Sequence, residues 1–158
     1  MALEIERKFL VIGNDWKASD SEYCIQGYLN LTPQRTVRVR CIGRQAFVTI
    51  KGITREGSRD EFEYEIPADD AEVLFNMCEG SLIKKRRHTV FHRGTKWEVD
   101  EFLEENEGLV IAEVELTAAD EQFDKPSWLG IDVTDDPRYF NSNLAVCPFK
   151  MWPEKSNT

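Results

Sequence analysis

Several features that often reveal a protein's class are missing from this sequence of 158 residues. It has no run of about 18 apolar residues and no apolar stretch of signal-peptide length near its start, so we expect no membrane partner. Its four cysteines form no C-x-x-C pair, which argues against a zinc site or a redox motif. Neither a G-x-x-x-x-G-K-[ST] loop nor an H-E-x-x-H helix segment occurs. These absences predict a reduced, cytoplasmic protein without a P-loop.

Positive charge is also in short supply overall. Lys and Arg number 20 against 29 Asp and Glu, which gives a formal net charge of -9. Such a balance argues against a nucleic-acid partner held by a broad basic patch, but it leaves room for a small basic cavity. With 41% hydrophobic residues, the chain is long enough to bury the core of one domain. We expect that domain over residues 1–150 and a C-terminal tail at residues 151–158.

What the sequence contains instead is a repeated alternation of charged and apolar residues. The segment L-E-I-E-R-K-F-L-V at residues 3–11 puts Glu4, Glu6 and Lys8 on one face of a strand, because successive side chains point to opposite faces. The alternation recurs in T-V-R-V-R-C-I (36–42), A-F-V-T-I-K-G (46–52), E-F-E-Y-E-I (61–66), T-K-W-E-V-D-E-F (95–102) and V-I-A-E-V-E-L (110–116). Many short strands with few helices predict an antiparallel barrel or sandwich.

A few helices are expected around these strands. Pro67 and an acidic first turn predict a helix that ends near Gly80. Thr117 is a candidate N-cap for a second helix, and Asn141 or Ser142 is a candidate for a short third one near the C-terminus.

The separation of the charges into like pairs points to a chemical role. Any single charged pair is better explained as a solvated sheet face, yet several strands here carry acids in pairs while others carry bases in pairs. Paired carboxylates suit Mg²⁺ or Mn²⁺, and Arg and Lys suit phosphate oxygens. His88 and His92 lie in a basic stretch near a turn and are expected at the surface. This set of residues favours phosphoryl transfer, which depends mainly on positioning and charge stabilisation.

The basic segment L-I-K-K-R-R-H-T-V at residues 82–90 allows two strand registers. One register puts Lys85 and Arg87 on the charged face. A slip of one residue would put Lys84 and Arg86 there instead.

Taken together and in order, these motifs resemble the CYTH superfamily, the triphosphate tunnel metalloenzymes. The segment E-I-E-R-K resembles the family's E-x-E-x-K signature, and the resemblance continues through Q-G-Y-L, V-R-V-R, V-T-I-K-G, E-Y-E-I, W-E-V-D-E-F and A-E-V-E-L to V-T-D-D-P-R-Y-F-N-S-N-L-A. It covers the chain from about residue 3 to residue 145. The resemblance implies an all-β-dominated α+β fold: a closed, roughly eight-stranded antiparallel β-barrel with a few peripheral helices. The charged strand faces would line a tunnel, and the apolar faces would pack outward against the helices.

The resemblance also implies a role for each matching residue. The main metal ligands would be Glu4, Glu6 and Glu115, and the further acidic residues of the tunnel would be Glu63, Glu65, Asp100 and Glu113. The phosphates would be held by Lys8, Arg38, Arg40, Lys51, Lys85, Arg87 and, at a terminal phosphate, Arg138. Lys85, Tyr28 and Lys8 would act in catalysis. The family's spacing from Gly80 favours the register that contains Lys85 and Arg87.

The activity implied by the resemblance is Mg²⁺- or Mn²⁺-dependent hydrolysis of inorganic tripolyphosphate to pyrophosphate and phosphate. The short chain, together with Tyr28 and Lys85, favours this small-molecule substrate. Adenylate cyclase and thiamine or nucleoside triphosphatase are alternatives that need an organic group recognised at the tunnel mouth, with candidate side chains Trp16, Trp97, Trp128 and Trp152. An alternative of another class is a non-catalytic module that binds polyphosphate or a nucleotide. The sequence also allows a homodimer.

Overall fold

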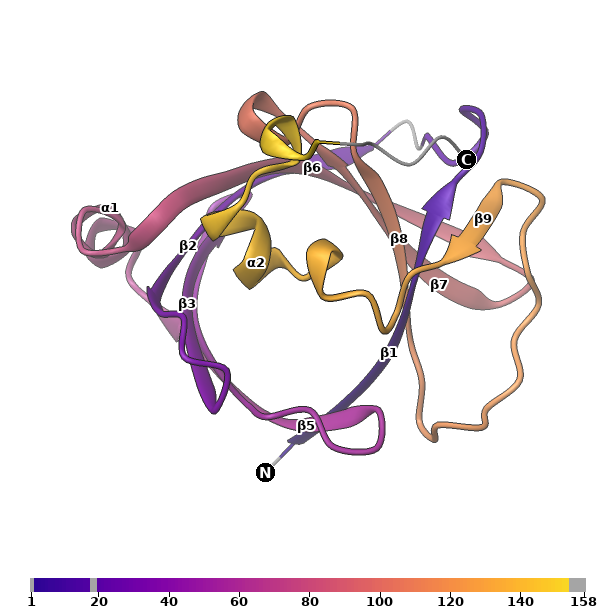
Figure 1. The fold of residues 1–158 in the computed structure, drawn as a ribbon, viewed down its shortest axis with the longest axis horizontal. Coiled ribbons are helices and arrows are strands. Elements are labelled where there is room, and N and C mark those ends of the chain that lie inside the picture. The colour runs from indigo at the N-terminus through magenta and orange to yellow at the C-terminus, as the bar shows by residue number, and fades with distance from the viewer. Residues whose placement is uncertain (1, 18–19, 154–158) are drawn as a thin grey trace.

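The alternating segments form the walls of a closed antiparallel barrel, seen along its opening in Figure 1. This computed structural model describes residues 2–17 and 20–153. Eight strands follow one another around the barrel in the order β5-β4-β3-β2-β6-β7-β8-β1, and β1 pairs with β5 to close it. Their bounds are β1 (Ala2–Val11), β2 (Ser21–Asn30), β3 (Arg35–Ile42), β4 (Gln45–Gly52), β5 (Ser58–Ile66), β6 (Glu79–His92), β7 (Thr95–Phe102) and β8 (Val110–Glu115). The predicted fold is confirmed.

Strand β1 joins three neighbours. On one edge it pairs with β8. On the other edge its first residues pair with β5, and its last residues pair with a short ninth strand, β9 (Leu129–Asp132). The Arg7 side chain of β1 holds β9 in place, because it bonds to Asp132 and donates to Thr134 Oγ1 at 3.2 Å.

The apolar outer faces of the strands are covered by different kinds of structure. Helix α1 (Ala68–Phe75) packs outside the barrel through Ala71, which is buried with Val39 and Ala46 of β3 and β4. The predicted helix at Thr117 is wrong. The Thr117 N–H and hydroxyl both donate to the Glu121 carboxylate at 2.6 Å, and residues 117–128 form an irregular segment instead.

That irregular segment replaces a helix over β7 and β8. Its Phe123 and Trp128 pack edge-on against the fully buried Trp97, with ring centroids 5.6 Å apart in each pair. Outward packing of the apolar faces is therefore observed, but only in part through helices. Among the described residues, no helix is long and apolar enough to cross a membrane.

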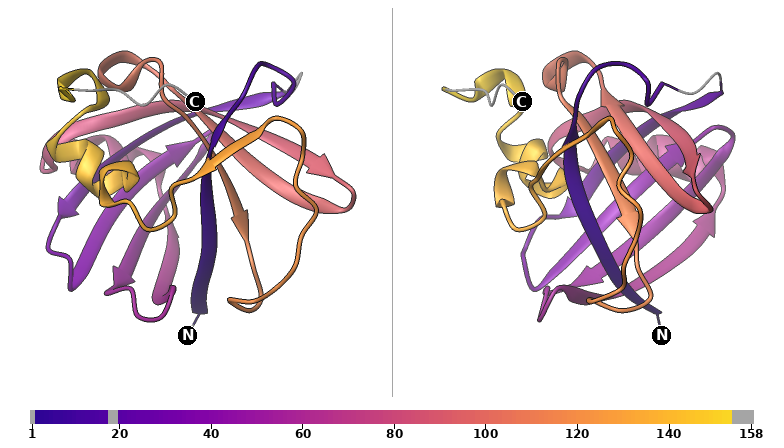
Figure 2. Two further views of the ribbon diagram at one scale, coloured as in Figure 1. Left: turned by 45° about the vertical axis from the view of Figure 1, so that its right-hand side comes forward. Right: turned by 90° about the vertical axis from the view of Figure 1, so that its right-hand side faces the viewer.

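The C-terminal part of the chain crosses one end of the barrel (Figures 1 and 2). It consists of the 3₁₀ helix η2 (Pro137–Tyr139), helix α2 (Asn141–Val146) and the 3₁₀ helix η3 (Phe149–Met151). Another 3₁₀ helix, η1 (Glu104–Asn106), follows β7. Tyr139, Leu144 and Trp152 pack into one cluster with Ile83 of β6. Trp152 thus packs with the barrel, although the predicted boundary assigns it to the tail; residues 154–158 lie outside the described part.

The N-cap of α2 is Phe140, and no side chain caps the helix. The expectation that Asn141 or Ser142 caps it is wrong. Asn141 is the first residue of the helix, and its side chain points to other partners inside the barrel.

The prediction that His88 lies at the surface is also wrong. Its side chain is buried; its ring lies 5.2 Å from that of Trp16, and its Nε2 lies 3.1 Å from Glu101 Oε1. The reason is the register of β6. Because Arg87 faces the lumen, His88 faces outward, where Trp16 covers it. His92, near the end of β6, is partly exposed.

Candidate active site

The barrel encloses a cavity of about 210 Å³ whose walls are almost entirely polar. Among the described residues, seven glutamates line it: Glu4, Glu6, Glu61, Glu63, Glu98, Glu113 and Glu115. Seven basic residues line it as well: Lys8, Arg38, Arg40, Lys51, Arg59, Lys85 and Arg87. Alternation along each strand explains this arrangement, because every second side chain of a barrel strand points inward. Most small barrels fill this space with packed side chains, whereas this one lines it with balanced formal charge.

The glutamates gather where β7, β8 and β1 run side by side. Glu98 lies directly opposite Glu113, and Glu6 lies directly opposite Glu115. Like charges opposite one another on a sheet are destabilising. Arg87 Nη1 donates to Glu98 Oε2 at 3.2 Å, while Lys8 Nζ lies 3.3 Å from Glu113 Oε1 and 3.7 Å from Glu6 Oε1. One ammonium therefore faces several carboxylates.

The crowding changes the proton affinity of these groups. Burial, followed by the negative charge of Glu113, raises the pKa of Glu6 to about 7. Burial opposes the charged form of Lys8, yet the charges of Glu113 and Glu6 outweigh it and raise the pKa of Lys8. The part of the wall around Glu6 and Glu113 thus carries more negative charge than Lys8 alone can neutralise.

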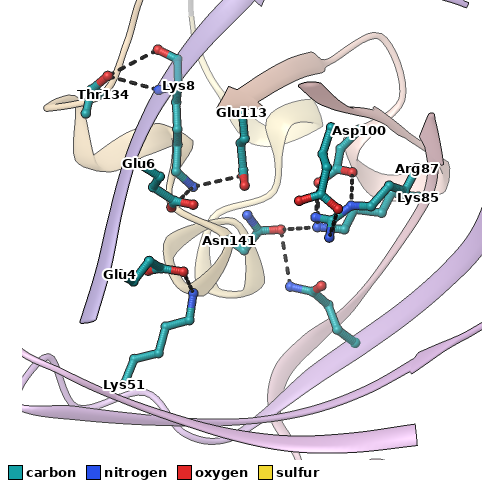
Figure 3. A network of polar contacts seen from close by, with 12 residues as sticks. Glu4, Glu6, Lys8, Lys51, Lys85, Arg87, Asp100, Glu113, Thr134 and Asn141 are labelled. Carbon is teal, nitrogen blue, oxygen red and sulfur yellow. Dashed lines mark hydrogen bonds and ion pairs between the residues drawn. The ribbon is translucent and has the colours of Figure 1, made fainter. Parts of the chain in front are cut away.

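Glu4 is better compensated than Glu6. Lys51 Nζ lies 2.7 Å from Glu4 Oε2, and Arg59 Nε donates to Glu4 Oε1 at 3.0 Å (Figure 3 shows Glu4 with Lys51). Burial alone would raise the pKa of Glu4, but these two cations lower it to about 2. Lys51 Nζ also lies 3.4 Å from Glu61 Oε2.

Next to these glutamates, Asp100 of β7 holds two bases of β6 in place from behind (Figure 3). It is completely buried, and its carboxylate accepts from Arg87 Nε at 2.8 Å and Arg87 Nη2 at 2.9 Å, while Lys85 Nζ lies 2.8 Å from Oδ2. Burial would raise the pKa of Asp100, but Arg87 and Lys85 hold it well below its usual range. The two bases are thereby fixed at the cavity wall.

Arg38 and Arg40 contribute a second basic surface from β3. Arg38 Nη2 donates to Thr49 Oγ1 at 3.2 Å, and Arg40 Nη2 donates to Glu63 Oε2 at 3.3 Å. Within the described part of the chain, the Nε atoms of both arginines are buried and have no hydrogen-bond partner. Unsatisfied buried donors are costly. The two arginines also line the cavity.

A chain of hydrogen bonds connects α2 to the barrel wall. Lys85 Nζ donates to Asn141 Oδ1 at 3.0 Å, and Gln26 Nε2 donates to the same oxygen at 3.2 Å. Gln26 Nε2 also lies 3.4 Å from the Tyr28 hydroxyl. Tyr28 is buried and lines the cavity, and burial raises its pKa.

Most of the predicted site residues line this cavity: Glu4, Glu6, Lys8, Tyr28, Arg38, Arg40, Lys51, Glu63, Lys85, Arg87, Glu113 and Glu115. Asp100 lies behind the wall, as described above. Glu65 is exposed near the end of β5 and does not line the cavity. Arg138 is exposed and pairs with Asp136, with Arg138 Nη2 2.7 Å from Asp136 Oδ2. We therefore leave Glu65 and Arg138 out of the proposed site.

The register of β6 follows the first of the two alternatives. Lys85 and Arg87 line the cavity. Lys84 and Arg86 lie outside, where Lys84 pairs with Glu104 at 3.1 Å and Arg86 donates to Ser21 at 3.2 Å.

Several cavity residues were missed from the sequence. Arg59, Glu61 and Glu98 belong to the same alternating faces as predicted residues, so the alternation itself was sufficient to find them. Asn141 and its neighbour Phe140 had no such signal, because they lie outside the strands.

The acidic side chains do not form a closed metal cage. In residues 2–17 and 20–153, no three His, Cys, Asp or Glu side chains converge closely enough to hold an ion. Instead, the carboxylates pair with lysines and arginines. Even so, the oxygen donors of Glu6, Glu113 and Glu115 lie on adjacent strands, and hard oxygen donors are what Mg²⁺ and Mn²⁺ accept.

Comparison with known proteins extends over most of the chain. The CYTH domain model matches residues 2–141. An inorganic triphosphatase of Acetivibrio thermocellus is 46% identical over 156 residues, covering 98% of this chain and 100% of that protein. An inorganic triphosphatase of Nitrosomonas europaea is 36% identical over 150 residues, covering 90% of this chain and 97% of that protein. A crystal structure of an inorganic triphosphatase superposes with a TM-score of 0.68 at 34% identity and covers 92% of this chain and 96% of its own. The family model matches most of the chain, and two relatives share more than a third of its residues. The chain therefore belongs to the CYTH domain family.

Proposed function

We propose that this protein hydrolyses inorganic tripolyphosphate to pyrophosphate and phosphate with the help of Mg²⁺ or Mn²⁺. The observation that carries the proposal is the enclosed cavity, in which basic residues face a crowded wall of glutamates. Two relatives that span nearly the whole chain are named inorganic triphosphatases, which supports the same activity here.

The size and lining of the cavity favour an inorganic substrate. A volume of about 210 Å³ is small compared with pockets for drug-sized organic ligands, which are about 300–1,000 Å³. The four tryptophans that could have recognised an organic group are buried in the apolar clusters and do not line the cavity. A nucleotide or thiamine triphosphate would therefore find little apolar surface beside its phosphates.

Divalent metal is expected at the acidic wall. CYTH triphosphate tunnel metalloenzymes depend on metals, and the residues that would hold one here are Glu4, Glu6, Glu113 and Glu115, with Glu63 farther along the wall. The surplus of carboxylates around Glu6 fits a cation. When bound, such an ion would neutralise charge on the phosphates and make water a better nucleophile.

The bases divide the work of holding the substrate. In hydrolysis, water oxygen bonds to the terminal phosphorus, the bond from that phosphorus to the bridging oxygen breaks, and pyrophosphate leaves. Arg38 and Arg40 line the cavity, and their guanidinium groups would donate to phosphate oxygens there. Lys51 pairs with Glu4. If Glu4 held a metal instead, Lys51 would be free to bind the phosphates.

Lys85 has a more specific role in this proposal. Its ammonium, fixed by Asp100, would stabilise the charge that develops on the leaving pyrophosphate. Tyr28 would orient the phosphate chain next to it, since both side chains line the cavity and are linked through Gln26 and Asn141. Lys8, between Glu6 and Glu113, would bind the phosphoryl group nearest to the acidic wall.

The test is phosphate release from tripolyphosphate, ATP and thiamine triphosphate, each with Mg²⁺, Mn²⁺ or EDTA. We expect release mainly from tripolyphosphate, equimolar with pyrophosphate, and no release in EDTA. Preference for an organic triphosphate would keep the site and change the substrate. Metal-dependent binding of tripolyphosphate without any release would replace the enzyme with a binding module.

We also propose a cytoplasmic location, because all four cysteines are free thiols. A homodimer would find apolar surface on the outside of β4 and β5, where Ile50, Phe62 and Tyr64 are exposed. Light scattering of the purified protein tests this assembly.

A further inference from the structure

Asn141 is the residue through which the C-terminal segment faces the cavity. It begins α2, which crosses one end of the barrel, and its side chain is partly buried beside the charged lumen. Arg138, the residue of this segment that was expected to meet phosphate, lies outside and pairs with Asp136. The approach of α2 to the substrate therefore depends on a neutral side chain.

The orientation of the Asn141 amide follows from its partners. Lys85 Nζ and Gln26 Nε2 can only donate, so the atom that they both approach must be the amide oxygen. These two bonds occupy both acceptor sites of that oxygen. The NH₂ group must then point the other way, and Figure 3 shows it turned toward the space between Lys8 and Glu113. Within the described residues, this Nδ2 has no hydrogen-bond partner.

We propose that Asn141 is a substrate-binding residue, whose NH₂ group donates to an oxygen of the phosphate nearest to α2. This inference rests on the proposed function and assigns α2 a part in recognising the triphosphate. The barrel wall fixes the donor beforehand, through Lys85 and Gln26, so little freedom is lost when the phosphate binds. Because a neutral donor adds no charge, Asn141 can lie beside Lys85 without repelling it.

A second role for Asn141 has to be distinguished from this one. Its oxygen could serve only to hold Lys85 in position, with the NH₂ group idle. Two substitutions separate the roles. Asn141→Asp keeps an acceptor for Lys85 and Gln26 but replaces the donor with a negatively charged acceptor, whereas Asn141→Ala removes both donor and acceptor. Asn143→Ala is the matched control, because Asn143 lies on the same helix, is exposed and donates to Pro137 O at 2.6 Å.

The experiment measures kcat/KM for tripolyphosphate with Mg²⁺, and also Kd for tripolyphosphate in EDTA by calorimetry, for the wild type and these three variants. We expect both Asn141 variants to lose about tenfold or more in kcat/KM, since a hydrogen bond to a charged group contributes about that factor. Their binding in EDTA should weaken in parallel. Asn143→Ala should stay within about twofold of the wild type, because it removes no group that faces the cavity.

Several results would overturn the inference. If Asn141→Asp behaves like the wild type while Asn141→Ala loses activity, the residue only positions Lys85. If Asn141→Ala behaves like the wild type, activity does not depend on a contact between Asn141 and phosphate. The same holds if Asn143→Ala loses as much kcat/KM as the Asn141 variants do. A wild type without turnover would refute the proposed function, and the comparison of Kd values would still decide the role of Asn141. A wild type that also fails to bind tripolyphosphate would refute both.

Discussion

Replacing Glu6 with glutamine should stabilise the metal-free protein above neutral pH. Burial and the neighbouring charges of Glu113 and Glu4 raise the pKa of Glu6 to about 7, from 4.5 in an unperturbed side chain. The unfolded chain therefore releases this proton at lower pH than the native protein does. As a consequence, the free energy of unfolding falls as the pH rises from 4.5 to about 7. The difference between these two values corresponds to about 3 kcal/mol once Glu6 is ionised.

Glutamine has nearly the same shape and no proton to lose, so Glu6→Gln avoids this penalty. We expect the variant and the wild type to differ by less than about 1 kcal/mol at about pH 5, and the variant to be more stable by up to about 3 kcal/mol at about pH 8. Urea unfolding in EDTA at both pH values measures the difference. Glu65→Gln, which changes an exposed glutamate of the same barrel, is the control and should alter neither value.

The same substitution should abolish metal-dependent turnover, because it replaces a proposed metal ligand with an amide. A variant that is both more stable and inactive would indicate that Glu6 is retained for function at the expense of stability. The reasoning would be refuted by a Glu6→Gln variant that is less stable than the wild type at about pH 8. Full activity of this variant would remove Glu6 from the metal site.

Three further predictions follow from the structure. Asp100→Asn should lower the free energy of unfolding by about 3–5 kcal/mol, because it leaves the buried Lys85 without a counter-ion and Arg87 with Glu98 alone. Asp136→Asn, on an exposed ion pair, should change it by less than about 1 kcal/mol in the same urea titration, and equal losses would contradict this account. Gly80→Ala should lower Tm more than Gly94→Ala: both residues have positive φ, but only at Gly80 would the added methyl lie 2.5 Å from a backbone carbonyl oxygen of α2. Equal shifts in Tm would mean that this close approach does not matter. Mn²⁺ should raise Tm more at about pH 8 than at about pH 5, because Glu6 must lose its proton to bind metal, and a pH-independent shift would argue for a metal site elsewhere.

The alternation of residues was enough to predict which side chains share a face of the barrel wall. A period of two puts Glu4, Glu6 and Lys8 on one face of β1 whatever the loops do. That this charged face lines the lumen and the apolar face lies outside was implied by the resemblance to the CYTH superfamily, since a half-buried sheet usually turns its charged face to solvent. The same logic applied to Glu61 and Glu98 would have completed the acidic wall.

The alternation could not predict how far each face extends along the tunnel. Glu65 shares a face with Glu63, but it lies near the open end of β5 and is exposed. Outside the strands there is no period to follow. Arg138 lies in a 3₁₀ helix and pairs with Asp136 two residues earlier, while Asn141 reaches the lumen through tertiary packing of α2.

The alternation of residues also could not predict which buried side chains form ion pairs with one another. Asp100 has the strand position of a lumen residue, yet both oxygens of its carboxylate are paired with Lys85 and Arg87. Thr117 was a reasonable helix cap by residue type, but its hydroxyl and N–H bond to Glu121 in a local turn. Such choices depend on partners that only the folded chain brings together.

The most direct test of the central claim is a crystal structure of the wild-type protein soaked with Mn²⁺ and tripolyphosphate. We predict an anomalous Mn²⁺ peak in the lumen beside Glu6 and Glu113, and phosphate density against Arg38 and Arg40. Mn²⁺ and phosphate bound only outside the barrel, with the lumen unchanged, would contradict the account.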